Sequence, residues 1–146
     1  MLFRSVSSEG RSIQRIDPAT DSVVKTSALG KDPGFLAAGE GGVWVQEQGD
    51  GTVARIDPQS GDVSGRIKVG AVLKWGDIDT GGGLVWLRTT EDQTFVVIDP
   101  KSMAILARVG KAEGSGALRF TDTGVWTSAH DVHTLTWWPD PAKLAK

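Results

Sequence analysis

The sequence contains no cysteine among its 146 residues, and aromatic residues make up only 7% of it. The lack of cysteine excludes disulfides, thiol catalysis and cysteine-ligated zinc. It leaves the compartment open, because a chain of this length can bury a core that needs no covalent cross-links.

The sequence also lacks an excess of positive charge and a long hydrophobic run. It has 16 Lys and Arg against 18 Asp and Glu, a net charge of −2. Nucleic-acid binding depends on cationic side chains that neutralise phosphates, so no nucleic-acid partner is expected. No run approaches the roughly 20 apolar residues of a membrane span, and no signal peptide is visible at residues 1–6. No phosphate-binding loop, Ser-His-Asp arrangement or metal motif of known spacing occurs.

A unit of about 40 residues is repeated along the chain. Trp44, Trp86 and Trp126 follow one another at spacings of 42 and 40 residues. The first two are each followed 13 residues later by an Asp-Pro pair, which begins at Asp57 and Asp99. A fixed period of this length indicates a repeat architecture and outweighs any single-residue signal.

Each repeat predicts four short strands separated by turns rich in Gly, Asp and Pro. No window of ten or more residues has helical periodicity. The first repeat lacks its first strand and the last lacks its fourth, so fourteen strands are expected, in groups of three, four, four and three. The predicted strands of the three later repeats are 35–38, 43–46, 52–56 and 63–69, then 77–79, 85–89, 94–98 and 104–109, then 117–120, 125–128 and 134–138.

Four-stranded units with a Trp in the second strand are typical of the blades of a β-propeller. The sequence therefore predicts an all-β protein in which residues 1–141 form about three and a half four-stranded blades. The blade parts are 2–29, 30–69, 70–110 and 111–141, and a frayed tail is expected at 142–146. An incomplete ring leaves two open sheet faces. Either two copies close the ring as a homodimer, or the chain is truncated and its neighbours are the blades of a larger propeller.

The sequences Gly-Gly-Val-Trp-Val (41–45), Thr-Val-Ala-Arg-Ile-Asp-Pro (52–58) and Ile-Lys-Val-Gly (67–70) resemble the bacterial YVTN/YncE-type propellers. They are also similar to the related virginiamycin B lyase-like propellers. The resemblance covers roughly residues 2–141 and implies a ring of about seven blades. It also suggests an extracytoplasmic location, periplasmic or secreted. The lyase relatives use His, Glu and a divalent cation to open a lactone ring, and only Glu47 matches the acidic position of their blade signature.

The loops between strands two and three, and those between strands four and one, are expected to lie at one end of the propeller. Both histidines, His130 and His133, fall in one of these loops beside Asp131. One hypothesis makes them a metal site or an acid/base pair, with Glu47 as a third candidate catalytic residue. The other makes them ordinary polar residues of a hairpin, with no cofactor.

Three further sets of residues are predicted from the same repeat. A face that binds a small molecule or a protein would include Trp75, Arg88, Glu91, His130 and Asp131. Trp44, Trp86 and Trp126 are expected to pack between blades. Because the last blade has no fourth strand, Trp137 and Trp138 are predicted to lie on an exposed self-association edge.

These features support three hypotheses about function. The first is a propeller module without enzymatic activity that presents its loop face to a ligand or partner. The second is a metal-assisted lyase or hydrolase, and the third is a structural fragment of a larger propeller. The fold by itself does not decide among them.

Overall fold

The computed structural model describes residues 3–74, 76–89 and 91–146, and these form fourteen strands in four antiparallel sheets. We call the sheets blades 1 to 4. In chain order, blade 1 contains β1 (Phe3–Ser7), β2 (Ser12–Asp17) and β3 (Ser22–Ala28); blade 2 contains β4 (Pro33–Gly39), β5 (Gly42–Glu47), β6 (Thr52–Ile56) and β7 (Val63–Lys68); blade 3 contains β8 (Ile78–Gly81), β9 (Leu84–Arg88), β10 (Phe95–Asp99) and β11 (Ala104–Val109); blade 4 contains β12 (Leu118–Thr121), β13 (Gly124–Ala129) and β14 (Thr134–Pro139). The predicted grouping into three, four, four and three strands is confirmed.

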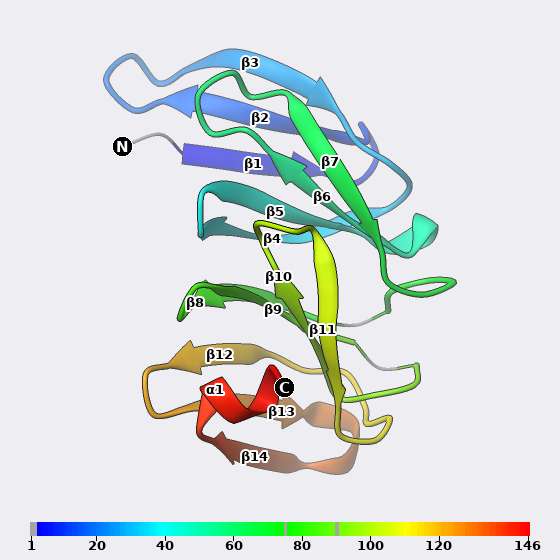
Figure 1. Cartoon of the computed structure of the whole chain (residues 1–146). Helices are drawn as coiled ribbons and strands as arrows, with labels where there is room; N and C mark the ends of the chain where they lie inside the picture. The colour runs from blue at the N-terminus through cyan, green and yellow to red at the C-terminus, as the bar shows by residue number, and fades with distance from the viewer. Residues whose placement is uncertain (1–2, 75, 90) are drawn as a thin grey trace.

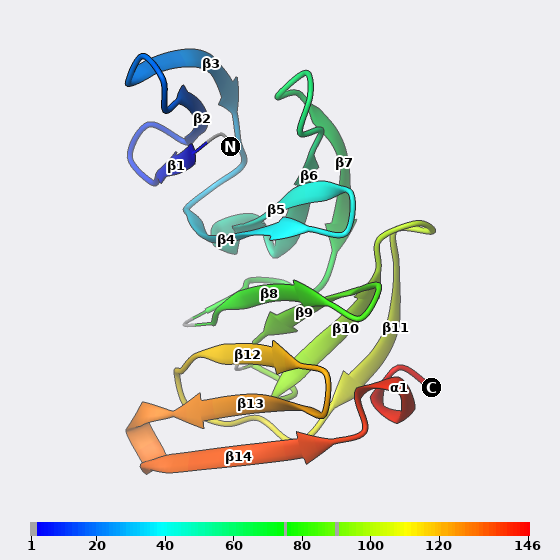
Figure 2. The same ribbon diagram turned by 90° about the vertical axis from the view of Figure 1, so that its left-hand side faces the viewer.

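The four blades fan out from a narrow inner side, where β4, β8 and β12 lie next to one another (Figure 2). The outer strands β3, β7, β11 and β14 are spread apart, and the N-terminus and C-terminus lie in the first and last blades (Figure 1). Blades 1 and 4 run away from the inner strands in opposite directions (Figure 2). The chain is therefore a partial β-propeller, an arc on one side of the central channel.

The Asp-Pro turns connect strands three and four as predicted. The side chain of Asp57 accepts hydrogen bonds from the backbone N–H groups of Gln59 and Ser60, both at 2.8 Å. Asp99 makes the same bond to the N–H of Lys101 at 2.9 Å. An aspartate that bonds its own backbone two residues later stabilises such a turn.

Hydrophobic clusters fill the spaces between successive blades. Between blades 2 and 3, Trp44 and Val53 pack against Val85 and Val96, all of them buried. Between blades 3 and 4 the equivalent Trp86 is buried in the cluster that includes Leu118 and Val125. Each blade thus presents two apolar faces, and we call them the N-side face, toward the preceding blade, and the C-side face, toward the following one.

The third repeat tryptophan departs from the prediction. Trp126 occupies the same position as Trp44 and Trp86, but its side chain is 40% exposed whereas theirs are 0% exposed. The reason is that nothing covers the C-side face of blade 4. The ring of Trp126 instead stacks on that of Trp137, which is 50% exposed, with centroids 6.1 Å apart.

Trp138 does not lie on an exposed edge, so this part of the self-association prediction is wrong. Alternation along β14 turns Trp138 toward blade 3, where its ring meets Phe95 edge-on with centroids 5.3 Å apart. Its indole N–H donates to the hydroxyl of Thr127 at 2.9 Å. Of the two tryptophans only Trp137 faces solvent.

The expected frayed tail is a short helix. Residues Pro141–Leu144 form α1, and Leu144 and Ala145 pack against the cluster between blades 3 and 4. Among the described residues no helix is long and apolar enough to span a bilayer.

We predict that replacing Trp86 with Ala lowers the free energy of unfolding by about 3–5 kcal/mol, the usual cost of emptying a fully buried aromatic site. The matched control is Trp126→Ala, at the same position of the next repeat, where the loss should be clearly smaller. Urea unfolding at low protein concentration, where association does not contribute, measures both. Equal losses would contradict this account of blade packing.

Candidate functional site

The loops predicted to gather at one end of the arc do contact one another. Each loop between strands two and three lies against the preceding loop between strands four and one. The short 3-10 turns η1 (Gln48–Asp50) and η2 (His130–Val132) make these contacts. In η1 the N–H of Gln48 donates to the carbonyl of Asp32 at 3.1 Å, and in η2 the N–H of His130 donates to that of Ser115 at 2.7 Å.

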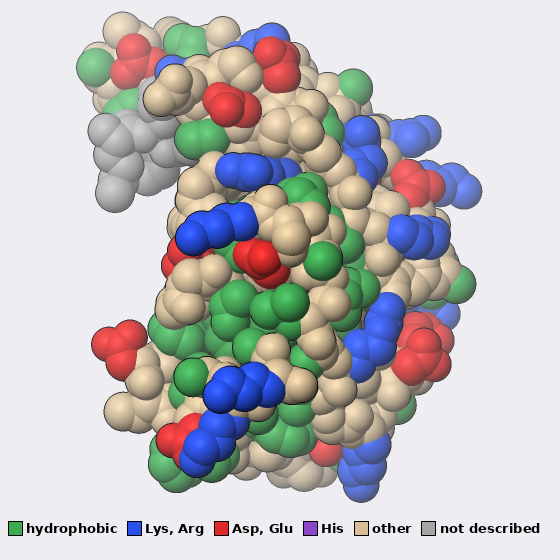
Figure 3. All heavy atoms as spheres, in the orientation of Figure 1, with side chains coloured by type: hydrophobic (Ala, Val, Ile, Leu, Met, Phe, Trp, Pro, Cys, Tyr) green, Lys and Arg blue, Asp and Glu red, His purple; other side chains and the backbone are tan. Residues whose placement is uncertain are grey.

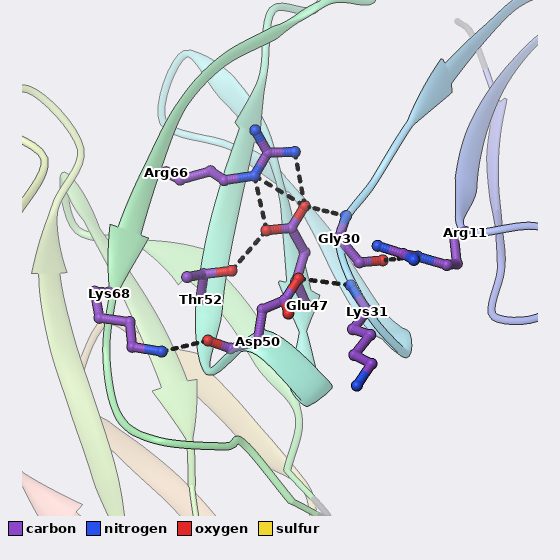
Figure 4. Close-up of polar contacts among 8 residues, drawn as sticks. All are labelled: Arg11, Gly30, Lys31, Glu47, Asp50, Thr52, Arg66 and Lys68. Atoms are coloured by element: carbon purple, nitrogen blue, oxygen red, sulfur yellow. Dashed lines mark hydrogen bonds and ion pairs between the residues drawn. The ribbon is translucent and has the colours of Figure 1, made fainter.

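Glu47 is a fully buried carboxylate at the end of β5. Arg66 on β7 donates to both of its oxygens, with Nε 2.9 Å from Oε2 and Nη2 3.0 Å from Oε1. The Thr52 hydroxyl and the N–H of Gly30 also donate to it, each at 2.6 Å. Figure 4 shows these groups converging on the carboxylate. All of its hydrogen-bonding capacity is therefore used inside the protein.

Neighbouring contacts extend this network to blade 1. The carboxylate of Asp50 accepts from the N–H of Lys31 at 2.7 Å, and its carbonyl accepts from the Lys68 ammonium at 2.5 Å. Arg11 in the turn between β1 and β2 donates to the carbonyl of Gly30 at 3.2 Å (Figure 4). Glu47 thus holds the segment that connects blades 1 and 2, and it is not placed to act as a catalytic group.

Arg88 is not part of a ligand-binding face, contrary to the prediction. Its side chain is fully buried and pairs with neither Glu47 nor Glu91. It donates instead to four backbone carbonyls, those of Thr89, Thr94, Gly114 and Ser128, at 2.6, 2.8, 2.6 and 3.2 Å. Burial lowers the pKa of the guanidinium, although the charges of Glu113 and Asp131 oppose this effect. Arg88 therefore joins the loops of blades 3 and 4 from inside.

The histidine loop does not form the catalytic arrangement that the sequence allowed. Asp131 accepts from the N–H and hydroxyl of Ser115 at 3.0 and 2.8 Å, so it holds the turn rather than an imidazole. These two hydrogen bonds keep the pKa of Asp131 below its usual value. His133 ends η2 in the left-handed conformation, with φ of 53°. Both histidines are exposed.

The other predicted site residues are not brought to the same place. Glu91 is exposed and forms a 3.6 Å ion pair with Lys74 at the surface. Trp75 lies outside the described residues. No group of three or more His, Cys, Asp or Glu side chains that could hold a metal ion occurs within residues 3–74, 76–89 and 91–146. Because Glu47 is also fully engaged, the residues described do not fit the divalent cation of the lyase relatives.

A pocket of about 380 Å³ opens on the inner side of the arc, and it is the best candidate for a binding site. Phe35 of β4 and Arg119 of β12 lie there beside the residue just before β8, the loop before β12 and the turn η2. The residues that line it are Phe35, Asp77, Ser115, Gly116, Ala117, Arg119 and His130. Of the predicted site residues that the structure describes, only His130 lines this pocket, and His133 does not.

Three of the residues that line the pocket occupy one position of the repeat. Phe35, Asp77 and Ala117 each come one residue before an inner residue that pairs with strand two. The side chain of Phe35 is 54% exposed, although most aromatic rings of the chain are covered. Sequence reasoning missed this site, yet the alignment of repeats contained a signal. A position that changes from Phe to Asp to Ala in successive blades cannot serve a common packing role.

Arg119 and Asp77 form the charged part of the pocket. The guanidinium donates to the buried Asp77 carboxylate from a side chain that is 64% exposed. Asp77 also accepts from the N–H of Ile78 at 2.8 Å. Nη1 of Arg119 also donates to the carbonyl of Leu118 at 2.5 Å. The N–H groups on Nε and Nη2 have no partner among the described residues, so they are available to a ligand.

The opposite side of the molecule is a mixed surface of charged and hydrophobic side chains (Figure 3). On the face that carries the outer strands, Lys and Arg side chains are scattered around a hydrophobic patch, and no histidine is visible (Figure 3). Lys and Arg side chains lie there among Asp and Glu (Figure 3), and a solvated surface of mixed charge is ordinary for a globular protein.

Comparisons with known proteins identify the fold. No family model matches the chain, and no curated protein matches it. Hydrazine synthase of Kuenenia stuttgartiensis is similar in structure, with a TM-score of 0.82 at 15% identity, over 94% of this chain and 42% of that one. The computationally designed Ika4 protein has a TM-score of 0.79 at 18% identity, over 94% of this chain and 84% of that one. BamB from Moraxella catarrhalis has a TM-score of 0.73 at 16% identity, over 95% and 40%.

The chain therefore spans less than half of the hydrazine synthase and BamB chains but most of the designed protein. The structural similarity establishes the β-propeller fold, but sequence identities this low establish nothing about activity.

We predict that Glu47→Gln lowers the free energy of unfolding at pH 7 by about 1–3 kcal/mol, because Arg66 loses its anionic partner. Burial would raise the pKa of Glu47, but hydrogen bonds from Arg66, Thr52 and Gly30 hold it below the ordinary value. The stability that the carboxylate contributes is therefore complete above about pH 4.3, the ordinary glutamate value, and is lost as pH falls through the lower folded pKa.

The difference between the wild type and Glu47→Gln should consequently shrink in acid. Urea unfolding from pH 7 down to the acid limit of folding tests this. The control is Asp62→Asn, which removes a surface ion pair with Lys25 and should have little effect. A difference that stays constant with pH would show that the charge of Glu47 does not matter.

Proposed function

We propose that this chain is a ligand-binding propeller module, and that the pocket on its inner side binds a small organic anion with an aromatic or apolar part. The observation that carries the proposal is the exposure of Phe35 beside free N–H groups of Arg119 in one concave site. Small-molecule sites combine an apolar lining with a few placed polar groups, and this pocket has that composition.

Four of the lining residues have a chemical role in this proposal. The ring of Phe35 offers a face for stacking against an aromatic or apolar group. The guanidinium of Arg119 offers charge-assisted hydrogen bonds to a carboxylate or phosphate, and Asp77 holds it in place. The imidazole of His130 has no hydrogen-bond partner among the described residues and adds a second donor on the rim.

The alternative hypotheses are less well supported. A lyase or hydrolase needs a base close to the reacting carbon, but Asp131 and Glu47 are both committed to holding loops. Membership of the YVTN/YncE-type family, and the extracytoplasmic location that it implies, rest on the sequence resemblance. A chain that is one arc of a larger propeller would carry the same pocket beside sites on other blades.

The proposal predicts that benzoate and phenyl phosphate bind in the pocket, whereas cyclohexanol, which has no charge, binds far more weakly. Chemical-shift changes in two-dimensional NMR spectra should centre on Phe35, Ala117 and His130. Arg119→Gln should weaken binding of either anion about tenfold or more, because a charge-assisted hydrogen bond is lost. Phe35→Ala should weaken it as well.

His133→Ala is the matched control, since this histidine lies in the same turn outside the pocket and should leave binding unchanged. Far-UV circular dichroism verifies that each variant is folded. Shift changes spread evenly over the surface, or binding unaffected by both Phe35→Ala and Arg119→Gln, would refute the assignment of the pocket.

A further inference from the structure

The C-side face of blade 4 is an exposed apolar surface, whereas the equivalent faces of the other blades are covered by the next blade. Its centre consists of Trp126, Leu135 and Trp137, which are 40%, 69% and 50% exposed. Their counterparts on blade 3 are Trp86, Phe95 and Val97, as the strand register shows, and all three are fully buried against blade 4. The same three positions are therefore buried on blade 3 and exposed on blade 4.

In the other blades the C-side face is covered by the N-side face of the next blade. On blade 3 that face consists of Leu87, Val96, Ile98 and Ile105. Blade 1 carries the same face uncovered at the other end of the arc. Its residues at the corresponding register positions are Ser5, Gln14, Ile16 and Val23, and Val23 is 50% exposed where its counterpart Ile105 is partly buried.

Two polar residues on the N-side face of blade 1 do not prevent such packing. Ser5 and Gln14 occupy the positions that Thr127 and Thr136 hold on blade 4. Blade 4 nevertheless packs on blade 3, with Thr127 only 2% exposed and its hydroxyl accepting a hydrogen bond from Trp138. Polar residues at the centre of an N-side face are therefore compatible with a buried contact between blades.

We infer that a second copy of this chain covers both open faces, with blade 4 of each copy packed on blade 1 of the other. The C-side face of one copy then meets the type of surface that covers a C-side face three times within the chain. Blades 1 and 4 run away from the channel in opposite directions, so the arc leaves the opposite side free for an equal arc (Figure 2). Two copies would form a closed ring of eight sheets, within the usual range for propellers. This inference does not depend on the ligand proposed above.

The mass in solution tests the inference. Sedimentation equilibrium over a dilution series should show a reversible change between the 15.5 kDa chain and twice that mass. Leu135→Lys on the C-side face and Val23→Glu on the N-side face should each weaken association about tenfold or more, because each buries an unpaired charge. Leu106→Glu is the control, since Leu106 is 43% exposed on the outer strand of blade 3, away from both faces.

Mixing the two variants distinguishes a ring from other contacts. In a mixed pair one contact is fully wild type, and the other carries two introduced charges of opposite sign, so the double mass should return at least in part. A single-chain mass at every dilution overturns the inference and favours missing blades of a larger propeller. If Val23→Glu does not change association, the inference is wrong, and two C-side faces pack on each other instead. If the mass keeps rising with protein concentration beyond twice the chain mass, the copies do not form a closed ring.

Discussion

The burial of apolar blade faces against neighbouring blades is the constraint on which this structure depends. A four-stranded sheet of this kind is apolar on two sides, so it is stable only between neighbours. Trp44 and Trp86 satisfy the constraint by filling the space in front of the next blade, and they are fully buried. Trp126 has the same identity and position but faces solvent. The fold of each blade is therefore local, whereas its stability depends on what lies beside it.

Polar groups fasten the blades at the loop end, and different side chains do this at equivalent positions. Glu47 binds Arg66 and the backbone of Gly30 in blade 2, whereas Arg88 binds backbone carbonyls on the loops of blades 3 and 4. Both side chains are buried, so each charge must be matched by several hydrogen bonds. Charged residues near the channel are thus not evidence of a ligand site unless their hydrogen-bonding groups remain free. Arg119 is the residue that meets this condition beside the inner pocket.

Function in such a repeat protein is expected where the repeat varies without a structural reason. The inner position occupied by Phe35, Asp77 and Ala117 has three different chemistries on one shared backbone. The scaffold positions the three residues, and their differences shape the pocket. In the dimer that we infer, assembly would also complete the channel beside this pocket.

The sequence by itself determined the number of blades, the order and grouping of the strands and the Asp-Pro turns, because these follow from local periodicity and turn chemistry. It also predicted which loops share one end. Only the tertiary structure decided which polar residues are free. Glu47 meets Arg66 across 19 residues of sequence and Arg88 reaches Gly114 across 26, so their burial depends on contacts that no local pattern records. The same holds for Trp137 and Trp138, since a neighbouring blade covers one side of β14 and nothing covers the other.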